Sequence, residues 1–324
     1  MKIVFLTRRF YPDIGGVEKH VYEISKRLMK KGHRVTIVTQ SQGEKDEIDG
    51  IRVIRIDSIP KNTSEKIHIW KWVLANRKLF KNANVIHSHD VFFWYLPIKL
   101  LFLSKKSFIT FHGYETYPIS KKAVIIRKIS ELLADGNIVV GDFIKKWYGT
   151  KPDYVIYGGV DVPIQFEKPK RLESAVFIGR LDEQTGVLDY AEAVDLIRKD
   201  NPKFEFSIVG DGKYKKRLER HKPLGFKENS MNYLKLYNFA FVSRYLSILE
   251  ALASRRLVFA LYDNPVKEDY LKMAPFAKFI IISNSPERLA EKVKYFLNNP
   301  KQSEKFVNEG CKWVKKQSWD NVVK

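Results

Sequence analysis

Three glycine-containing turns hold the residues best suited to phosphate chemistry: Gly15-Gly16, Gly179-Arg180 and Gly210-Asp211-Gly212. Glycine leaves backbone N–H groups open to an anion, and an arginine guanidinium can make two parallel charge-assisted bonds to a diphosphate. Each turn follows a predicted strand, and open α/β sheets bind ligands beyond the carboxyl ends of their strands. Paired glycines such as Gly15-Gly16 also occur for packing alone. The combination of the three turns nevertheless predicts a diphosphate site.

Histidine and cysteine residues are candidate metal ligands in the sequence, but their arrangement leads us to predict no metal site. His87 and His89 lie two residues apart on a predicted strand, and we interpret them as structural residues that face opposite sides of the sheet, with His89 toward the cleft. Cys311 is the one cysteine, which excludes an internal disulfide and any cysteine-rich metal centre. A lone cysteine also favours the cytoplasm.

The elements that must position these turns alternate in type along the first half of the chain. Val17, Val21, Ile24 and Leu28 recur at helical spacing, and Gly32 follows as a C-cap, which predicts a helix directly after the first glycine turn. Short β-rich runs separate such helices, the pattern of a parallel sheet covered by helices. The predicted strands are 2–7, 34–39, 52–57, 84–87, 107–111, 137–140 and 153–156.

A second α/β series follows a predicted linker, 161–173, which contains Pro163 and Pro169. Its predicted strands are 174–178, 205–209, 240–242, 257–260 and 278–282, and its predicted helices are 187–198, 247–254 and 286–297. Two comparable sheets joined by one linker predict two Rossmann-like lobes with a cleft between them. The chain length of 324 residues agrees with two domains.

Seven short motifs in order resemble the retaining GT-B enzymes of glycosyltransferase family 4. They are Gly15-Gly16-Val17-Glu18, His87-Ser88-His89-Asp90, Thr110-Phe111-His112-Gly113, Tyr157-Gly158-Gly159-Val160-Asp161, Gly179-Arg180-Leu181, Gly210-Asp211-Gly212 and Leu249-Glu250-Ala251-Leu252-Ala253. The resemblance spans nearly the whole chain. It implies an acceptor-side lobe over 1–162, a nucleotide-sugar-binding lobe over 163–310 and a C-terminal helix, 311–324, that returns toward the first lobe.

The resemblance also implies roles for individual residues. Gly15, Gly16 and Gly210 would approach the diphosphate of a UDP- or GDP-sugar, and Arg180 would grip it. Glu250 would hold the ribose hydroxyls, His112 would lie beside the transferred sugar as the catalytic residue, and neither metal nor cofactor would be needed. His112 can instead be a hydrogen-bonded residue at a strand end, and Glu250 a solvated helix residue.

The sequence departs from the family pattern in the donor site. The usual first glutamate, eight residues before Glu250, is Val242, and Thr185 stands where a second phosphate-binding lysine is expected. Arg255-Arg256-Leu257 replaces a common glycine and proline turn. Arg244 lies near the shortened loop, and we expect it to supply the missing positive charge. These departures leave open a divergent, non-catalytic nucleotide-sugar-binding subunit.

The net charge of +21 requires an anionic partner. Trp70, Trp72 and the aromatic run 92–95 lie among lysines, as in helices that bind an anionic membrane surface, although core helices would show the same residues. This pattern favours a glycan or lipid-linked acceptor and a peripheral position on the inner face of the membrane, since no apolar run is long enough to span a bilayer. Nucleic-acid binding is a weaker alternative, because the lysines are dispersed.

Overall fold

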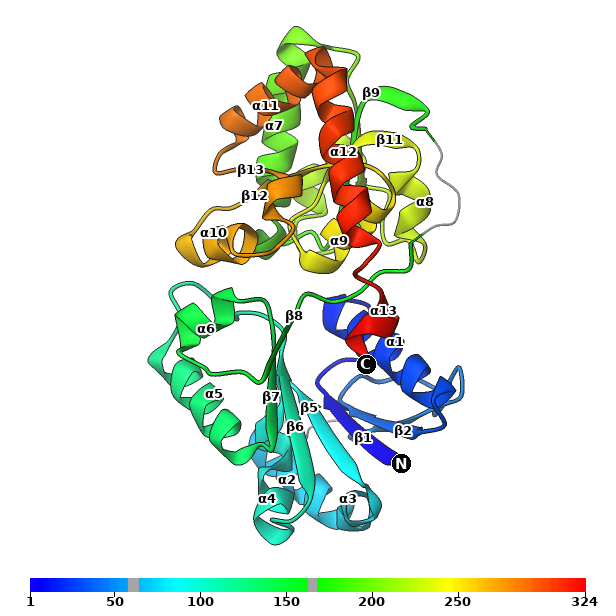
Figure 1. Ribbon diagram of the computed structural model, residues 1–324, viewed down its shortest axis with the longest axis vertical. Helices are drawn as coiled ribbons and strands as arrows, with labels where there is room; N and C mark the ends of the chain where they lie inside the picture. The colour runs from blue at the N-terminus through cyan, green and yellow to red at the C-terminus, as the bar shows by residue number, and fades with distance from the viewer. Residues whose placement is uncertain (58–63, 163–167) are drawn as a thin grey trace. The chain divides into compact units, whose positions relative to one another are not determined.

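The computed structural model describes residues 1–57, 64–162 and 168–324 (Figure 1). Its residues form two compact units. Unit 1 comprises Met1–Ile156 together with Val322–Lys324, and unit 2 comprises Tyr157–Asn321. The division after Ile156 falls six residues before the predicted end of the first lobe at 162. Part of the predicted linker, 163–167, lies outside the described residues.

Unit 1 is built on an eight-stranded sheet with the order β3-β4-β2-β1-β5-β6-β7-β8. All neighbouring strands are parallel except β3 and β4, which pair antiparallel. Parallel neighbours need crossover helices, which the predicted alternation of strands and helices supplies. The strands are β1 Lys2–Thr7, β2 Arg34–Thr39, β3 Glu47–Ile48, β4 Ile51–Arg55, β5 Val85–His89, β6 Lys106–Phe111, β7 Gly136–Val140 and β8 Tyr154–Ile156.

Each helix of unit 1 follows a strand along the chain, except α3, which directly follows α2. They are α1 Gly16–Lys30, α2 Glu65–Ala75, α3 Arg77–Asn82, α4 Phe92–Leu101, α5 Lys121–Leu133 and α6 Phe143–Tyr148. Helix α1 buries Val21 and Ile24 in a cluster that includes Phe5 and Ile37 of the sheet. Val323, near the end of the chain, also packs against this cluster. The carboxyl ends of β1, β5 and β6 therefore lie next to the start of α1.

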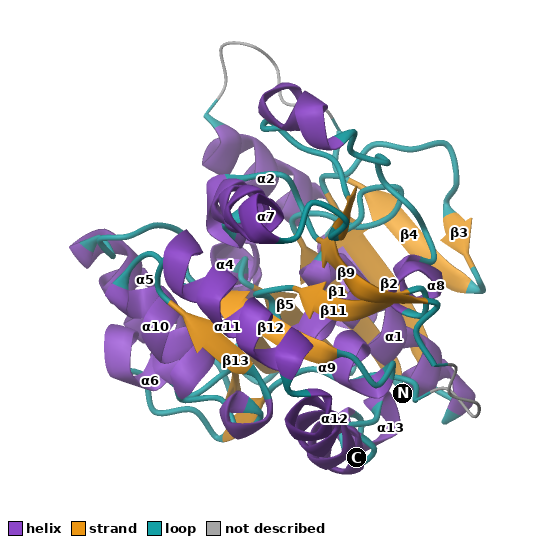
Figure 2. Ribbon diagram, turned by 90° about the horizontal axis from the view of Figure 1, so that it is seen from above, coloured by secondary structure: helices purple, strands orange, loops and turns teal. Residues whose placement is uncertain are grey.

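Unit 2 is built on a five-stranded parallel sheet with the order β10-β9-β11-β12-β13. Its strands are β9 Arg171–Ile178, β10 Glu205–Val209, β11 Tyr237–Phe241, β12 Leu257–Leu261 and β13 Ile281–Ser283. Its α-helices are α7 Val187–Asp200, α8 Ser230–Leu234, α9 Tyr245–Ala253, α10 Pro265–Lys272, α11 Pro286–Asn298, α12 Pro300–Val314 and α13 Trp319–Val322. Three 3₁₀ turns complete it: η1 Glu183–Thr185, η2 Lys216–His221 and η3 Ala277–Phe279. Helix α11 lies beside α7 and packs against β13 (Figures 1 and 2).

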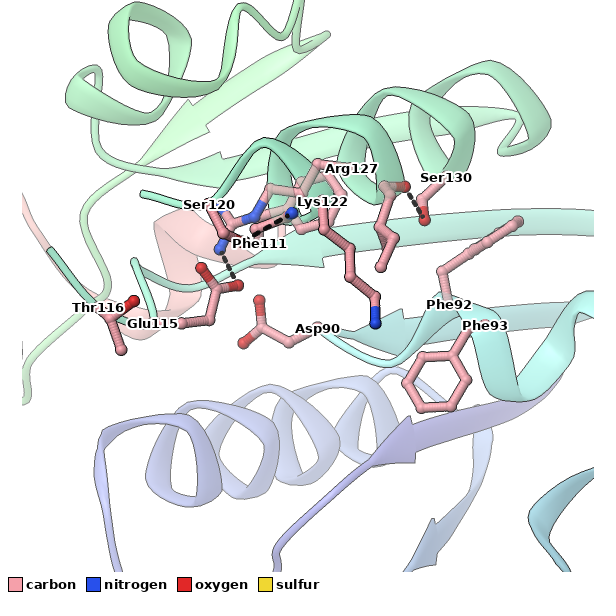
Figure 3. A pocket seen from close by; sticks show the side chains of 12 residues that line it. Asp90, Phe92, Phe93, Phe111, Glu115, Thr116, Ser120, Lys122, Arg127 and Ser130 are labelled. Atoms are coloured by element: carbon pink, nitrogen blue, oxygen red, sulfur yellow. Dashed lines mark hydrogen bonds and ion pairs between the residues drawn. The ribbon is translucent and has the colours of Figure 1, made fainter. Parts of the chain in front are cut away.

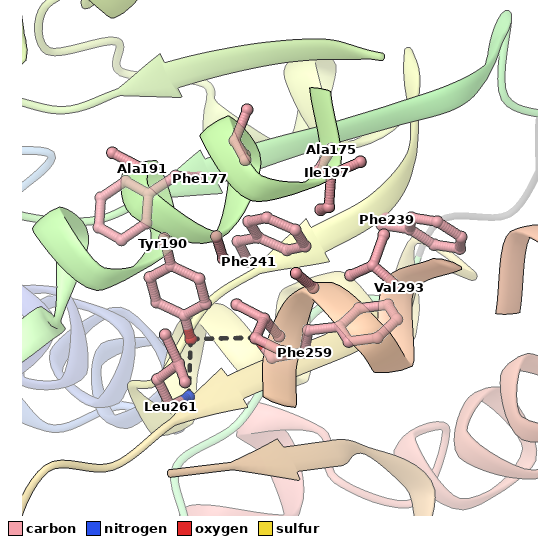
Figure 4. Close-up of a cluster of buried hydrophobic side chains, with 14 of the residues drawn as sticks. Ala175, Phe177, Tyr190, Ala191, Ile197, Phe239, Phe241, Phe259, Leu261 and Val293 are labelled. Carbon is pink, nitrogen blue, oxygen red and sulfur yellow. Dashed lines mark hydrogen bonds between the residues drawn. The ribbon is translucent and has the colours of Figure 1, made fainter. Parts of the chain in front are cut away.

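The core of unit 2 combines aliphatic side chains with a group of packed aromatic rings (Figure 4). The rings of Tyr190 and Phe241 stack with their centroids 5.2 Å apart, and Phe259 packs edge-on against Phe241. The Tyr190 hydroxyl donates to the carbonyl oxygen of Phe259 and accepts from the backbone N–H of Leu261, at 3.1 and 2.9 Å. Because the buried hydroxyl both donates and accepts a hydrogen bond, its burial leaves no polar atom unpaired. The two bonds also hold α7 on β12.

Candidate functional site

The turn after β9 is closed by its own backbone and by Thr185. The Thr185 hydroxyl lies 2.7 Å from the carbonyl oxygen of Arg180 and 2.9 Å from that of Asp182, and the residue is 4% exposed. The hydroxyl of Ser243, just beyond β11, donates to the carbonyl oxygen of Thr185 at 3.0 Å. Thr185, at the position of the expected lysine, is therefore a structural residue that shapes the turn.

Two arginines converge on one oxygen beside this turn. Nη2 of Arg180 lies 3.2 Å from Oε1 of Gln184, and Nη2 of Arg244 donates to the same Oε1 atom. Arg180 is exposed and also pairs with Asp182, with Nε 3.2 Å from Oδ2. The structure thus brings together Arg180 and Arg244, although 64 positions separate them in the sequence. An anionic oxygen in place of Oε1 would receive charge-assisted bonds from both guanidinium groups.

Lys267 is a third basic residue of this region, and no sequence pattern marks it as part of the site. It lies in the first turn of α10 and is 2% exposed. Its Nζ atom lies 2.6 Å from the carbonyl oxygen of Ser243, 3.4 Å from that of Gln184 and 4.6 Å from the centroid of the Tyr270 ring. Burial, reinforced by the charge of Arg244, lowers its pKa well below the ordinary value. Lys267 therefore ties the η1 turn to the loop that carries Arg244.

Gly210 packs directly against the arginine turn. Its φ is +151°, and a Cβ atom on it would come within 1.8 Å of the carbonyl oxygen of Gly179. Its N–H donates to the carbonyl oxygen of Gly225 at 2.9 Å. The structure therefore requires glycine here for the close approach of two turns, whereas the diphosphate contact of Gly210 stays a prediction.

The segment before Glu250 explains why no glutamate stands eight residues earlier. Val242 is completely buried, and its N–H donates to the carbonyl oxygen of Phe259 at 3.2 Å, so this position belongs to the core. Glu250 lies in the middle of α9 and is 6% exposed, which excludes the solvated alternative. Its predicted contact with a ribose stays a prediction.

Gly15 and Gly16 form the start of α1 in unit 1. Gly15 has an extended backbone and is the N-cap, and Gly16 is the first helical residue. A Cβ atom on Gly15 would lie 2.5 Å from Oε2 of Glu18, because the Glu18 side chain folds back over the helix start. The absence of a side chain at Gly15 thus leaves room for a carboxylate near the positive end of the helix dipole.

Four histidines gather near the carboxyl ends of β5 and β6. Nδ1 of His89 lies 2.9 Å from Nε2 of His112, and the rings of His20 and His112 meet edge-on with centroids 4.7 Å apart. His87 and His89 stack at 4.5 Å, so our expectation that they face opposite sides of the sheet is wrong. Residues two apart on a strand point to the same face. Burial lowers the pKa of His20 to about 3 and of His87 to about 4, and those of His89 and His112 well below the ordinary value.

A pocket of about 250 Å³ opens in unit 1 between the ends of β5 and β6 and helix α5 (Figure 3). Arg127 is 4% exposed, and the central carbon of its guanidinium group lies 3.7 Å from the centroid of the Tyr148 ring. Its Nη2 atom donates to Oε1 of Glu115 at 2.9 Å. Tyr148 donates to Oε2 of the same glutamate at 2.7 Å. Asp90 accepts the backbone N–H of His112 at 3.0 Å, and Phe93 also lines the pocket. Carboxylates beside an aromatic ring suit a ligand rich in hydroxyl groups.

Asp90 belongs to one of the sequence motifs, but no sequence pattern predicts this pocket. Among the basic residues of α5, Arg127 is buried and the lysines are exposed. A helical sequence pattern alone does not show which lysine or arginine turns inward. The predicted interfacial run is mostly core instead: Phe92, Trp94 and Tyr95 are at most 3% exposed. The core alternative is therefore right for these aromatics.

Solved structures with the same fold are GT-B glycosyltransferases. Sucrose-phosphate synthase from Thermosynechococcus elongatus aligns with a TM-score of 0.75 at 15% identity, over 99% of this chain and 96% of that one. Anabaena HepE, solved with UDP and glucose, aligns with a TM-score of 0.76 at 15% identity, over 100% and 97%. The predicted fold, two Rossmann-like α/β lobes of the GT-B class, is thereby confirmed.

Family models define the class more closely. Residues 14–163 match the model for Glycosyltransferase Family 4, and residues 173–299 match that for Glycosyl transferases group 1. An uncharacterized glycosyltransferase of Methanocaldococcus jannaschii is 24% identical over 99% of this chain and 95% of its own length. One chain of the human phosphatidylinositol N-acetylglucosaminyltransferase is 33% identical over 26% of this chain and 19% of its own length. The two consecutive domains support a GT-B glycosyltransferase.

Proposed function

We propose that this glycosyltransferase takes its sugar from a UDP- or GDP-sugar, with Arg180 and Arg244 holding the diphosphate. The observation that carries the proposal is the convergence of both guanidinium groups on Oε1 of Gln184. The departing nucleoside diphosphate gains negative charge, which two arginines can stabilise without a metal ion. The UDP bound in the structures of Anabaena HepE and of an α-glucosyltransferase supports this donor class. Retention of anomeric configuration is proposed from the family resemblance alone.

His112 is proposed as the catalytic residue beside the transferred sugar. Nδ1 of His89 lies 2.9 Å from its Nε2 atom, and Asp90 accepts its backbone N–H at 3.0 Å. The first contact orients the imidazole ring of His112, and the second fixes the backbone that carries it. A ring held in this way loses little freedom when it contacts a sugar hydroxyl.

The acceptor is proposed to be a glycan or a lipid-linked sugar, bound at the pocket of Asp90, Glu115 and Arg127. The exposed face of α5 beside this pocket supports a lipid-linked acceptor at a membrane surface. Ile125, Ile129 and Leu132 are 57%, 49% and 83% exposed, and these helix positions alternate with exposed lysines at 121, 122 and 128. Apolar side chains flanked by lysines are what an anionic bilayer surface binds. The human relative, which is named for phosphatidylinositol, agrees with such an acceptor.

Thermal-shift titration with UDP-, GDP- and ADP-sugars tests the donor site. One of them should raise the unfolding temperature, and Arg180→Ala and Arg244→Ala should each weaken that binding about tenfold to a hundredfold, the value of a charge-assisted bond of about 1.5–3 kcal/mol. Arg217→Ala is the matched control, because Arg217 is exposed in the same unit outside the cluster. If Arg180→Ala and Arg244→Ala both left donor binding unchanged, the proposal that these arginines hold the diphosphate would be refuted.

Gln184→Glu is a sharper variant because its side chain has nearly the same shape. A carboxylate between Arg180 and Arg244 should raise the unfolding temperature of the free protein, since it pairs with both guanidinium groups, and should weaken nucleotide binding at least tenfold. If the cluster had a purely structural role, Gln184→Glu would raise the unfolding temperature of the free protein and leave nucleotide binding unchanged.

Hydrolysis of the donor sugar separates an enzyme from a non-catalytic binding protein. Release of free sugar from the stabilising donor should fall in His112→Ala, whereas the shift caused by the nucleoside diphosphate alone should persist. Donor binding without any release or transfer of sugar would favour the non-catalytic alternative. If the protein bound nucleic acid and no donor raised its unfolding temperature, the alternative of a nucleic-acid-binding protein would be favoured.

A further inference from the structure

Three histidines in unit 1 come close enough to share one ion. They come from three separate elements: His20 from α1, His89 from the end of β5, and His112 from just after β6. One ring nitrogen of each lies within 4.8 Å of the other two, and Nδ1 of His89 lies 2.9 Å from Nε2 of His112. Tetrahedral zinc holds its nitrogen ligands at about 2.0–2.1 Å, which puts them roughly 3.3 Å from one another. Side-chain shifts of about an ångström therefore convert the cluster into a zinc site.

The chemistry of these side chains also fits a transition metal. Burial keeps the imidazoles uncharged at neutral pH, and a neutral imidazole has the free lone pair that a metal needs. His20 and His89 are 2% and 1% exposed, and Phe5 packs edge-on against the ring of His89 at 5.1 Å. The Nε2 atom of His89 is buried without a hydrogen-bond partner among the described residues, so the ring has one fewer bond to hold it in its present orientation. Three nitrogens favour Zn²⁺, Co²⁺ or Cu²⁺ over Mg²⁺, which prefers oxygen ligands.

We propose that His20, His89 and His112 form a binding site for Zn²⁺ and that the bound ion inhibits sugar transfer. The second part depends on the proposed function, in which the ring of His112 contacts the transferred sugar. Nε2 of His112 cannot ligate a metal and stay bonded to Nδ1 of His89, so the ion removes the bond that orients the catalytic ring. Its open fourth position would hold a water molecule near the sugar. Zinc would thus act as an inhibitor and take no part in the reaction.

Titration of the full chain, free of any polyhistidine tag, with Co²⁺ tests the metal site. Tetrahedral Co²⁺ absorbs visible light strongly, and we expect this absorption to saturate at one equivalent and to disappear when Zn²⁺ is added. His20→Gln, His89→Gln and His112→Gln should each weaken the affinity at least about tenfold. His221→Gln, a histidine of unit 2, is the matched control and should bind Co²⁺ as the unmodified chain does.

Two results would overturn the metal site: no tetrahedral Co²⁺ spectrum, or an equal loss of affinity in His221→Gln. His89→Gln can destabilise the fold because His89 is buried, so the thermal unfolding of each variant is measured as well. His112→Gln is the safer variant because His112 is only partly buried. A loss of Co²⁺ affinity in His112→Gln at unchanged unfolding temperature, with unchanged affinity in His221→Gln, supports the site even if His20→Gln and His89→Gln unfold.

Inhibition is measured separately from binding. We expect Zn²⁺ to suppress donor-sugar hydrolysis, EDTA to restore it, and His20→Gln to raise the half-inhibitory Zn²⁺ concentration at least tenfold. Zinc binding without inhibition refutes the link to catalysis. A chain that binds Co²⁺ but never hydrolyses a donor refutes the proposed function and leaves the metal site standing.

Discussion

At the scale of single residues, the proposed donor site has a cation from another loop beside the turn in which the family pattern predicts a lysine. Thr185 replaces the lysine that the family pattern predicts, and its hydroxyl closes the turn. Arg244, from a different loop, points its guanidinium at the same Gln184 that Arg180 contacts. The electrostatic field depends on distance between charges, so a cation from another element serves an anionic ligand equally well.

Gly210 yields a prediction at the same scale. Gly210→Ala should lower the free energy of unfolding by several kcal/mol, because the added Cβ would lie 1.8 Å from a backbone oxygen that cannot move without opening the turn. Gly225→Ala is the matched control: its φ is +74°, but a Cβ there meets nothing within 4 Å, so only about 1–2 kcal/mol of backbone strain is expected. Chemical denaturation measures both. Equal losses in the two variants would contradict the role of close approach.

At the scale of elements, the end of α9 shows how an unusual residue can occupy a standard motif. The N–H of Arg255 bonds the carbonyl oxygen of Leu252, and that of Arg256 bonds the carbonyl oxygen of Ala251, which is the Schellman pattern. Arg255 has a φ of +56°, a conformation that glycine adopts without strain. Helix α1 ends in the same pattern with Gly32 at φ +81°. The two helix ends therefore form a natural pair for comparison.

Introducing glycine at one helix end and removing it from the other should change the stability of the protein in opposite directions. Arg255→Gly should stabilise the protein by up to about 1 kcal/mol, because it removes the backbone strain of the left-handed conformation. Gly32→Ala should destabilise it by about 1 kcal/mol for the same reason, since a Cβ on Gly32 meets no neighbouring atom within 4 Å. Thermal unfolding checks both changes. A loss of stability in Arg255→Gly would mean that the hydrogen bond from its side chain to Asn308 outweighs the strain.

At the scale of the whole molecule, the proposed contact with an anionic membrane surface rests on the net charge of +21 and on the exposed apolar face of α5. No helix among the described residues is both long and apolar enough to cross a membrane. We expect the chain to bind vesicles that contain anionic phosphatidylserine, to bind neutral phosphatidylcholine vesicles weakly, and to be released by salt.

Substitutions on α5 separate a specific surface from general charge. Ile125→Glu combined with Leu132→Glu should weaken vesicle binding at least tenfold in a sedimentation assay, because it removes apolar area and adds negative charge. Leu172→Glu is the control, since Leu172 is also 67% exposed but lies in unit 2. Equal weakening by Leu132→Glu alone and by Leu172→Glu, which change the net charge by the same amount, would indicate that net charge alone drives binding.

The sequence by itself determined the elements and their order. Alternating strands and helices indicated two parallel sheets, and the predicted strands at 2–7, 34–39 and 205–209 have the bounds of β1, β2 and β10. These features are local, because hydrophobic periodicity and turn residues act over a few neighbouring positions. The position of Arg180 just after a strand could also be predicted, whereas its contact with the same glutamine as Arg244 could not.

Only the tertiary structure decided which side chains meet. Lys267 reads as a surface residue of α10, yet it is buried against the backbone of Ser243 and Gln184. His20, His89 and His112 come from three elements, and no spacing in the sequence indicates that their ring nitrogens lie within 4.8 Å of one another. The physical reason is that parallel pairing brings the ends of β1, β5 and β6 to one edge of the sheet. Contacts there depend on strand order and register, which local patterns do not encode.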